Sequence, residues 1–135
     1  MNNASGLRMD NAQVLRWKLT TPNQFKSRAF VQGRISKLYG EQGDHTHFAI
    51  QLGRDSREIV EIVYNKAFGT LPALRVGSVV VACGDYITAT ARSPQGHPAS
   101  PAGAIVHWVH MSDNGNHPSG FVMIDNVMYG NRPGR

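Results

Sequence analysis

Hydrophobic and polar residues alternate along much of this chain, and the alternation predicts a mainly β protein. Between residues 28 and 38, Ala29, Val31 and Ile35 fall on one face, and the polar residues between them fall on the other. An alternation of period two is the pattern of a half-buried strand. Gly33, on the apolar face, is expected to permit the bend or bulge at which a barrel strand coils.

Further apolar stretches predict four more strands, at residues 45–52, 57–64, 79–86 and 104–109. A short helical or irregular segment is expected between the third and fourth of the five strands. A long loop, rich in Ala, Ser, Pro and Gly, is expected between the fourth and fifth, at residues 88–103. Three strands, a short connecting helix and two strands is the order of a five-stranded OB-type barrel. The sequence therefore predicts that fold class, with a further hairpin around Asp125 and Asn126.

The two ends of the chain are expected to lie outside the barrel. The predicted domain spans residues 28–130, and a chain of 135 residues is long enough for one such core. Residues 1–27 are expected to form an N-terminal extension, in which Val14, Leu15 and Trp17 favour a short helix. Residues 131–135 are expected to be a disordered tail. Residues 39–44 are expected to form a loop.

Basic residues are concentrated in the first third of the chain. Residues 1–40 hold seven Lys and Arg side chains against one acid, within a net charge of +5. Lys and Arg neutralise phosphates, so this distribution favours a polyanionic partner, although basic charge also serves solubility. Nucleic-acid contacts are predicted for Arg28, Arg34, Lys37 and Trp108. An aromatic ring such as that of Trp108 can stack on a base, but strand aromatics more often belong to a core.

Several classes of protein are disfavoured. The chain has no run of about 18 apolar residues, which argues against a membrane span. The first thirty residues contain no apolar signal region, which favours a cytoplasmic location, or a periplasmic one if a signal has been removed. Cys83, the single cysteine, lies in an apolar run and is expected to be a small buried hydrophobe.

Six histidines are the most informative chemical feature. His45 and His47 are two residues apart on a predicted strand, so both should point away from the core face. His107, His110 and His117, with Asp113, are predicted to form a metal site, because imidazole and carboxylate groups bind divalent transition metals such as zinc. His107 and His110 differ in strand parity. They can converge only if the strand ends or bulges after Trp108.

Two of these histidine segments carry a resemblance to a known family. The segment Asp44-His45-Thr46-His47-Phe48 and the later Ala104-Ile105-Val106-His107-Trp108-Val109-His110, followed by Asp113, His117 and Gly120, resemble the bacterial domain of unknown function 3465 family. The resemblance spans about residues 30–130 and implies that His45, His107, His110 and His117 share one site. The chain departs from the family in lacking an export signal and in its longer loop at 88–103. The family brings no activity with it.

Three functions are compatible with these features. The first is a small basic OB-type binding module for nucleic acid or another anionic ligand, with the histidine cluster as its site. The second is a metal- or histidine-dependent phosphodiesterase or nuclease with catalytic groups at His45, His107, His110 and His117, since imidazole titrates near neutrality. The third is a protein-interaction domain in which the histidines are structural. The fold alone does not decide among them.

Overall fold

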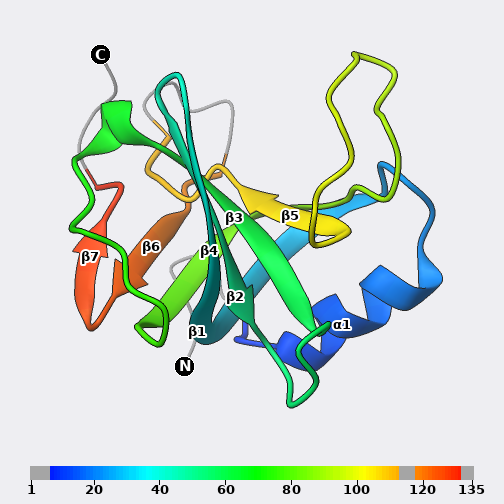
Figure 1. The fold of residues 1–135 in the computed structure, drawn as a ribbon, viewed down its shortest axis with the longest axis horizontal. Helices are drawn as coiled ribbons and strands as arrows, with labels where there is room; N and C mark the ends of the chain where they lie inside the picture. The colour runs from blue at the N-terminus through cyan, green and yellow to red at the C-terminus, as the bar shows by residue number, and fades with distance from the viewer. Residues whose placement is uncertain (1–6, 113–117, 132–135) are drawn as a thin grey trace.

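A computed structural model describes residues 7–112 and 118–131 of the chain, and the fold is mainly β (Figure 1). The elements in chain order are α1 (Asn11–Thr20), β1 (Lys26–Gln42), β2 (His45–Gln51), β3 (Ile59–Asn65), the short 3-10 helix η1 (Lys66–Phe68), β4 (Val79–Thr88), β5 (Ala104–His107), β6 (Phe121–Ile124) and β7 (Val127–Tyr129). None of the helices in the described ranges has the length and hydropathy needed to cross a bilayer.

Five of the strands pair into a closed ring in the order β1-β2-β3-β5-β4, and β4 pairs back with β1. Neighbours are antiparallel, except that β3 and β5 run parallel. The 17-residue strand β1 closes the ring because its first half pairs with β4 and its second half with β2. The change of partner occurs at Arg34, whose Cα partners are Val79 on β4 and Gln51 on β2.

The core fills the inside of this ring. Phe48, Ile62, Tyr64 and Tyr86 are fully buried there. The helix α1 packs against the same core through Val14, which is 1% exposed, and its Trp17 ring lies 5.0 Å from that of Tyr86. Residues 11–20 therefore share the hydrophobic core of the ring.

Most predicted strands are confirmed, with shifts at their ends. The strand β1 continues to Gln42, through residues predicted to be a loop, because Tyr39 packs on an apolar cluster outside the ring with Ala49 and Ile59. The predicted C-terminal hairpin is confirmed as β6–β7. Its turn residues Asp125 and Asn126 have φ angles of 49° and 71°, as a two-residue turn with both central residues left-handed requires. Residues 132–135 of the predicted tail lie outside the described residues.

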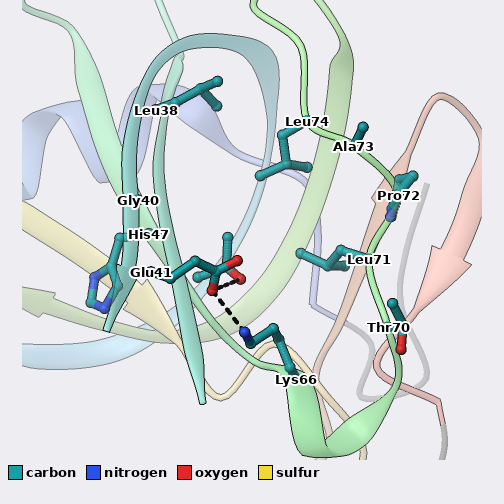
Figure 2. Close-up of a pocket in the computed structure, with 11 residues that line it drawn as sticks. Leu38, Gly40, Glu41, His47, Lys66, Thr70, Leu71, Pro72, Ala73 and Leu74 are labelled. Atoms are coloured by element: carbon teal, nitrogen blue, oxygen red, sulfur yellow. Dashed lines mark hydrogen bonds and ion pairs between the residues drawn. The ribbon is translucent and has the colours of Figure 1, made fainter. Parts of the chain in front are cut away.

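The extended β1–β2 hairpin borders an apolar hollow of about 350 Å³ (Figure 2). Leu38 lies on the hairpin side of this hollow, and Leu71 and Leu74 lie opposite. An ion pair between Glu41 and Lys66, with oxygen and nitrogen 3.0 Å apart, joins the two walls. The Glu41 carboxylate accepts hydrogen bonds from Lys66 and from the Thr46 hydroxyl, and these lower the pKa of the Glu41 carboxyl.

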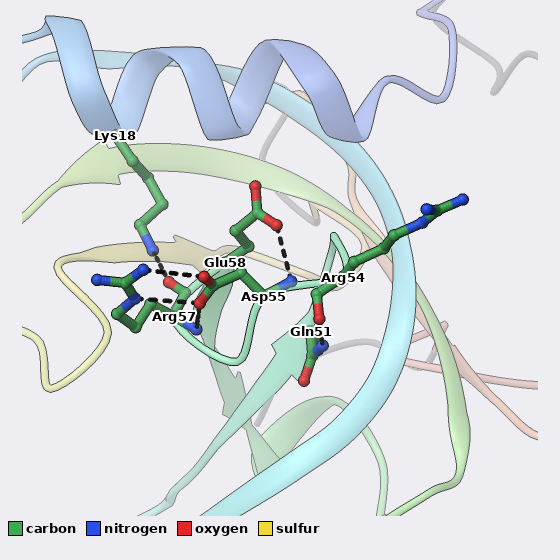
Figure 3. A network of polar contacts seen from close by, with 6 residues as sticks. All are labelled: Lys18, Gln51, Arg54, Asp55, Arg57 and Glu58. Carbon is green, nitrogen blue, oxygen red and sulfur yellow. Dashed lines mark hydrogen bonds and ion pairs between the residues drawn. The ribbon is translucent and has the colours of Figure 1, made fainter.

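A polar network closes the turn between β2 and β3 and attaches the helix α1 to it (Figure 3). The Asp55 carboxylate accepts hydrogen bonds from the backbone and the guanidinium of Arg57, at 2.8 to 3.1 Å. The Glu58 carboxylate accepts from the Asp55 backbone N–H at 2.9 Å. Lys18, on α1, donates to the carbonyls of Ile59 and Arg57. Side-chain groups thus satisfy backbone groups that the turn leaves unpaired.

Asp55 makes the stability of the fold sensitive to acid. Its hydrogen bonds to Arg57 lower the pKa of its carboxyl from 3.8 to about 2. A carboxyl with a lowered folded-state pKa contributes stability above its unfolded pKa and loses that contribution as the pH falls through the folded value. As the pH falls from about 4 to about 2, we expect the free energy of unfolding to decrease less in Asp55→Asn than in the parent chain. Urea titration at each pH measures it. The matched control is Asp44→Asn, which removes one carboxyl at an exposed turn away from Arg57.

Candidate ligand-binding cleft

A cleft of about 590 Å³ lies between the outer face of the ring and the segment that joins β4 to β5. The outer faces of β2, β3 and β5 form its floor, and the joining segment, residues 89–103, forms its roof. In Figure 1 this segment is the yellow-green loop that projects from the ring near β5. The polar side chains that line the cleft include Tyr39, His47, Glu61, His97, Ser100 and His107.

The strand register places two of these histidines in one row across the floor. His47 on β2 is the Cα partner of Val63 on β3. In the parallel pair, Ile62 is the partner of Val106 on β5. Val63 and His107 are the next residues on these two strands, and both line the cleft. Neighbouring strands are about 4.8 Å apart, which puts the His47 and His107 backbones about 10 Å apart. Val63 is the small apolar residue between them.

Glu61 connects the floor of the cleft to its roof. Its residue exposure is 6%, and one carboxylate oxygen lies 2.6 Å from His47 Nδ1. The other oxygen accepts a hydrogen bond of 2.8 Å from the Ser100 hydroxyl. A buried carboxylate is costly unless it is hydrogen-bonded in this way. Because a carboxylate only accepts hydrogen bonds, His47 donates from Nδ1 in this contact.

The Tyr39 hydroxyl is a polar group in the cleft whose bonding capacity is unused. It is buried and has no hydrogen-bond partner among the described residues. Burial raises the pKa of this phenol, and the negative charge of Glu61 raises it further. Tyr39 therefore stays protonated near neutral pH. An unpaired buried hydroxyl of this kind is destabilising.

The roof segment, predicted as a long loop, is held by hydrogen bonds to Asn23 and by others within the segment. The Asn23 side chain accepts from the backbone N–H groups of Thr90 and Ala91. At the base, the Ser100 N–H donates to the Ala89 carbonyl at 2.9 Å. At the tip, Ser93 and His97 are joined through backbone and side chain. A roof held in this way is preorganised, so a ligand pays little ordering entropy on entering the cleft.

Basic side chains lie at the rim of the cleft. A neighbouring hollow shares Ser100 and Pro101 with it and is lined by Lys37 and Arg57. Near another part of the cleft, Lys26 on β1 is the Cα partner of Ile87 on β4, which lines the cleft. Lys26 and Lys37 are exposed, and neither side chain forms a hydrogen bond or ion pair with another described residue.

The other predicted nucleic-acid contacts are engaged within the fold. Arg28 forms an ion pair with Asp85, with nitrogen and oxygen 3.0 Å apart, and donates to the Ser119 carbonyl at 2.6 Å. Arg34 donates to the Gly77 carbonyl at 2.8 Å. Trp108 is half-buried and its ring lies 4.6 Å from that of His110. Of the four predicted contacts, Lys37 is the one that lines the hollow next to the cleft.

The structure places the predicted site histidines in different surroundings. His107 lines the cleft, whereas His45 begins β2 and is not among the residues that line it. His110 is 4% exposed, and its ring stacks on that of Phe68 with centroids 3.5 Å apart and planes 11° apart. The strand β5 ends at His107, and Trp108 has a φ angle of 57°, which turns the chain before His110.

The predicted metal site receives no support within the described ranges. No group of three or more His, Cys, Asp or Glu side chains there could hold a metal ion. His107 and His110 lie in the separate surroundings given above. Asp113 and His117, the other two predicted ligands, lie outside the described residues.

Among the residues of the cleft, Glu61 and Ser100 were missed in the sequence. A signal for Glu61 was present, since it is the one charged residue in the apolar run Ile59-Val60-Glu61-Ile62-Val63. A charged side chain inside a buried strand needs a partner. The alternation of side chains along the two strands puts Glu61 and His47 on the same face, so His47 is a candidate for that partner. Ser100 carried no such signal in an irregular segment.

Comparisons with known proteins add no family: the chain matches no protein-family model, and no curated protein matches it significantly.

Proposed function

We propose that the chain is an OB-type binding module that holds single-stranded nucleic acid, or another anionic ligand, in the cleft beneath residues 89–103. The strand order β1-β2-β3-β5-β4, with β1 returning to β4, supports the OB assignment. OB domains bind oligonucleotides on the face of their second and third strands, between the loops that follow the first and fourth strands. The cleft lies at the corresponding place.

The observation that carries this proposal is the composition of the cleft and its rim. Tyr39, His47 and His107 offer ring faces and hydrogen-bonding groups on which bases can stack and pair. Lys26 and Lys37 stand on either side, with charges that no described residue neutralises. Stacking groups inside a groove with cations at its edges suit a single strand, whose phosphates can follow the rim.

Charge removal at the rim tests the proposal. We expect the double variant Lys26→Ala/Lys37→Ala to weaken binding of a fluorescein-labelled single-stranded oligonucleotide about tenfold at 50 mM salt, by loss of two phosphate contacts. Fluorescence anisotropy across a salt series should also show a shallower dependence of log K on log salt. Arg75→Ala is the matched control, because Arg75 is an exposed cation between η1 and β4, away from the lining residues.

Two results would overturn the nucleic-acid proposal. One is the absence of binding even at low salt, where phosphate contacts are strongest. The other is an equal loss of affinity from Arg75→Ala and from one lysine of the pair, which would mean that the oligonucleotide senses net charge and not the cleft.

A further inference from the structure

We propose that the cleft also cleaves RNA, with His47 as general base and His107 as general acid in the attack of a ribose 2′-hydroxyl on the adjacent phosphodiester. This inference rests on the proposed function, because the RNA strand must first occupy the cleft. It replaces the predicted set of His45, His107, His110 and His117 with a pair that the strand register puts on one floor.

His47 has the surroundings of a general base. Its Nδ1 is 2.6 Å from the Glu61 carboxylate, which is itself held by Ser100. This arrangement fixes the ring orientation and stabilises the positive charge that the ring acquires when Nε2 takes a proton. Figure 2 shows the His47 ring turned away from the apolar hollow that the leucines line, on the other side of the hairpin. Glu61 is therefore a positioning residue in this scheme.

His107 stands where the complementary acid is needed. With the two backbones about 10 Å apart, the imidazoles can reach toward a phosphate held over Val63 from opposite sides. That placement suits in-line displacement, in which the entering and leaving oxygens lie on opposite sides of phosphorus.

The reaction balances without a further reactant. His47 Nε2 takes the 2′-hydroxyl proton, the 2′-oxygen forms a bond to phosphorus, and the bond from phosphorus to the 5′-oxygen breaks. His107 gives its proton to that 5′-oxygen. The products are a 2′,3′-cyclic phosphate and a free 5′-hydroxyl, and proton exchange through water restores both imidazoles. DNA, which lacks the 2′-hydroxyl, would bind in the cleft without being cleaved.

The test uses a labelled DNA oligonucleotide with one internal ribonucleotide, in buffer with EDTA, and an all-DNA strand beside it. We expect cleavage at the ribonucleotide to a cyclic phosphate end, and at least a ~100-fold loss of kcat in His47→Ala and in His107→Ala. His45→Ala is the matched control, because His45 shares the strand and face of His47 outside the cleft. It should retain full activity, whereas the losses in His47→Ala and His107→Ala, purified in the same way, exclude a contaminating nuclease.

The Glu61→Gln variant tests whether Glu61 positions His47, by comparing the effects on kcat and on KM. We expect it to lower kcat at least about tenfold while KM stays within about twofold, because the carboxylate acts on the base and not on the bound strand. Thermal unfolding of each variant shows whether the fold is intact, and His47→Gln serves if His47→Ala unfolds.

The outcomes separate this inference from the proposed function. If the strand binds, binding weakens in Lys26→Ala/Lys37→Ala and the ribonucleotide stays intact, cleavage is refuted while binding stands. If nothing binds at low salt, both fail. A loss of activity in His97→Ala with none in His107→Ala would overturn the assignment of the acid, since His97 lines the same cleft from its roof.

Discussion

Replacing Gly33 with alanine is expected to lower the free energy of unfolding by about 3 kcal/mol, at the upper end of overpacking costs. A Cβ atom at this position would lie 2.2 Å from the Gln51 carbonyl oxygen and 2.9 Å from its carbon. These are backbone atoms of β2, which cannot rotate away as a flexible side chain would. Relief requires β1 and β2 to separate at the point where β1 leaves β4.

The measurement is urea unfolding of Gly33→Ala, followed by circular dichroism and tryptophan fluorescence. Gln32→Ala is the control, because Gln32 is exposed on the same strand, two residues before the change of partner. Its effect should stay within about 0.5 kcal/mol, as for most surface substitutions. Equal stability of Gly33→Ala and the parent chain would show that β1 and β2 do not approach each other as described.

Gly33 also shows what the sequence can predict. The alternation around it assigns the strand and its faces, and a glycine on the apolar face of a strand indicates a bend or a close backbone approach. The register places this glycine beside Val80, one residue before the strand changes partner. Local patterns of this kind predict strands well, because side-chain direction alternates with a fixed period.

The cleft could not be predicted in the same way, because its contacts join residues far apart in the chain. Glu61 bonds to His47, 14 residues before it, and to Ser100, 39 residues after it. Parity tells which face a side chain occupies, but not which strands adjoin or which loop covers them. Whether His107 and His110 could share a site, as predicted, depended on where the strand β5 ends. The left-handed backbone at Trp108, a residue that rarely adopts it, had no sequence signal.

Replacing His110 with alanine is expected to lower the free energy of unfolding by about 3 kcal/mol, as truncation of a well-packed ring does. His110 is 4% exposed, stacked on Phe68, and its Nδ1 lies 2.9 Å from the Met111 carbonyl oxygen. Removing the ring leaves a cavity beside η1 and frees a carbonyl that the imidazole N–H satisfied. Urea unfolding measures the loss, and His45→Ala, at a half-exposed histidine, should cost under about 1 kcal/mol.

A double-mutant cycle with Phe68→Leu isolates the stack from the cavity. Leucine keeps apolar bulk beside His110 but offers no ring face, so the coupling free energy between the two positions should be about 1 kcal/mol. His110→Ala, studied where it is still folded, should then bind oligonucleotide as tightly as the parent chain, because the stack is not among the residues that line the cleft. Unchanged stability together with lost binding would reverse this assignment and return His110 to the functional site. The two histidines of this short segment therefore have different surroundings. His107 faces the cleft, and His110 packs η1 against the turn that follows β5.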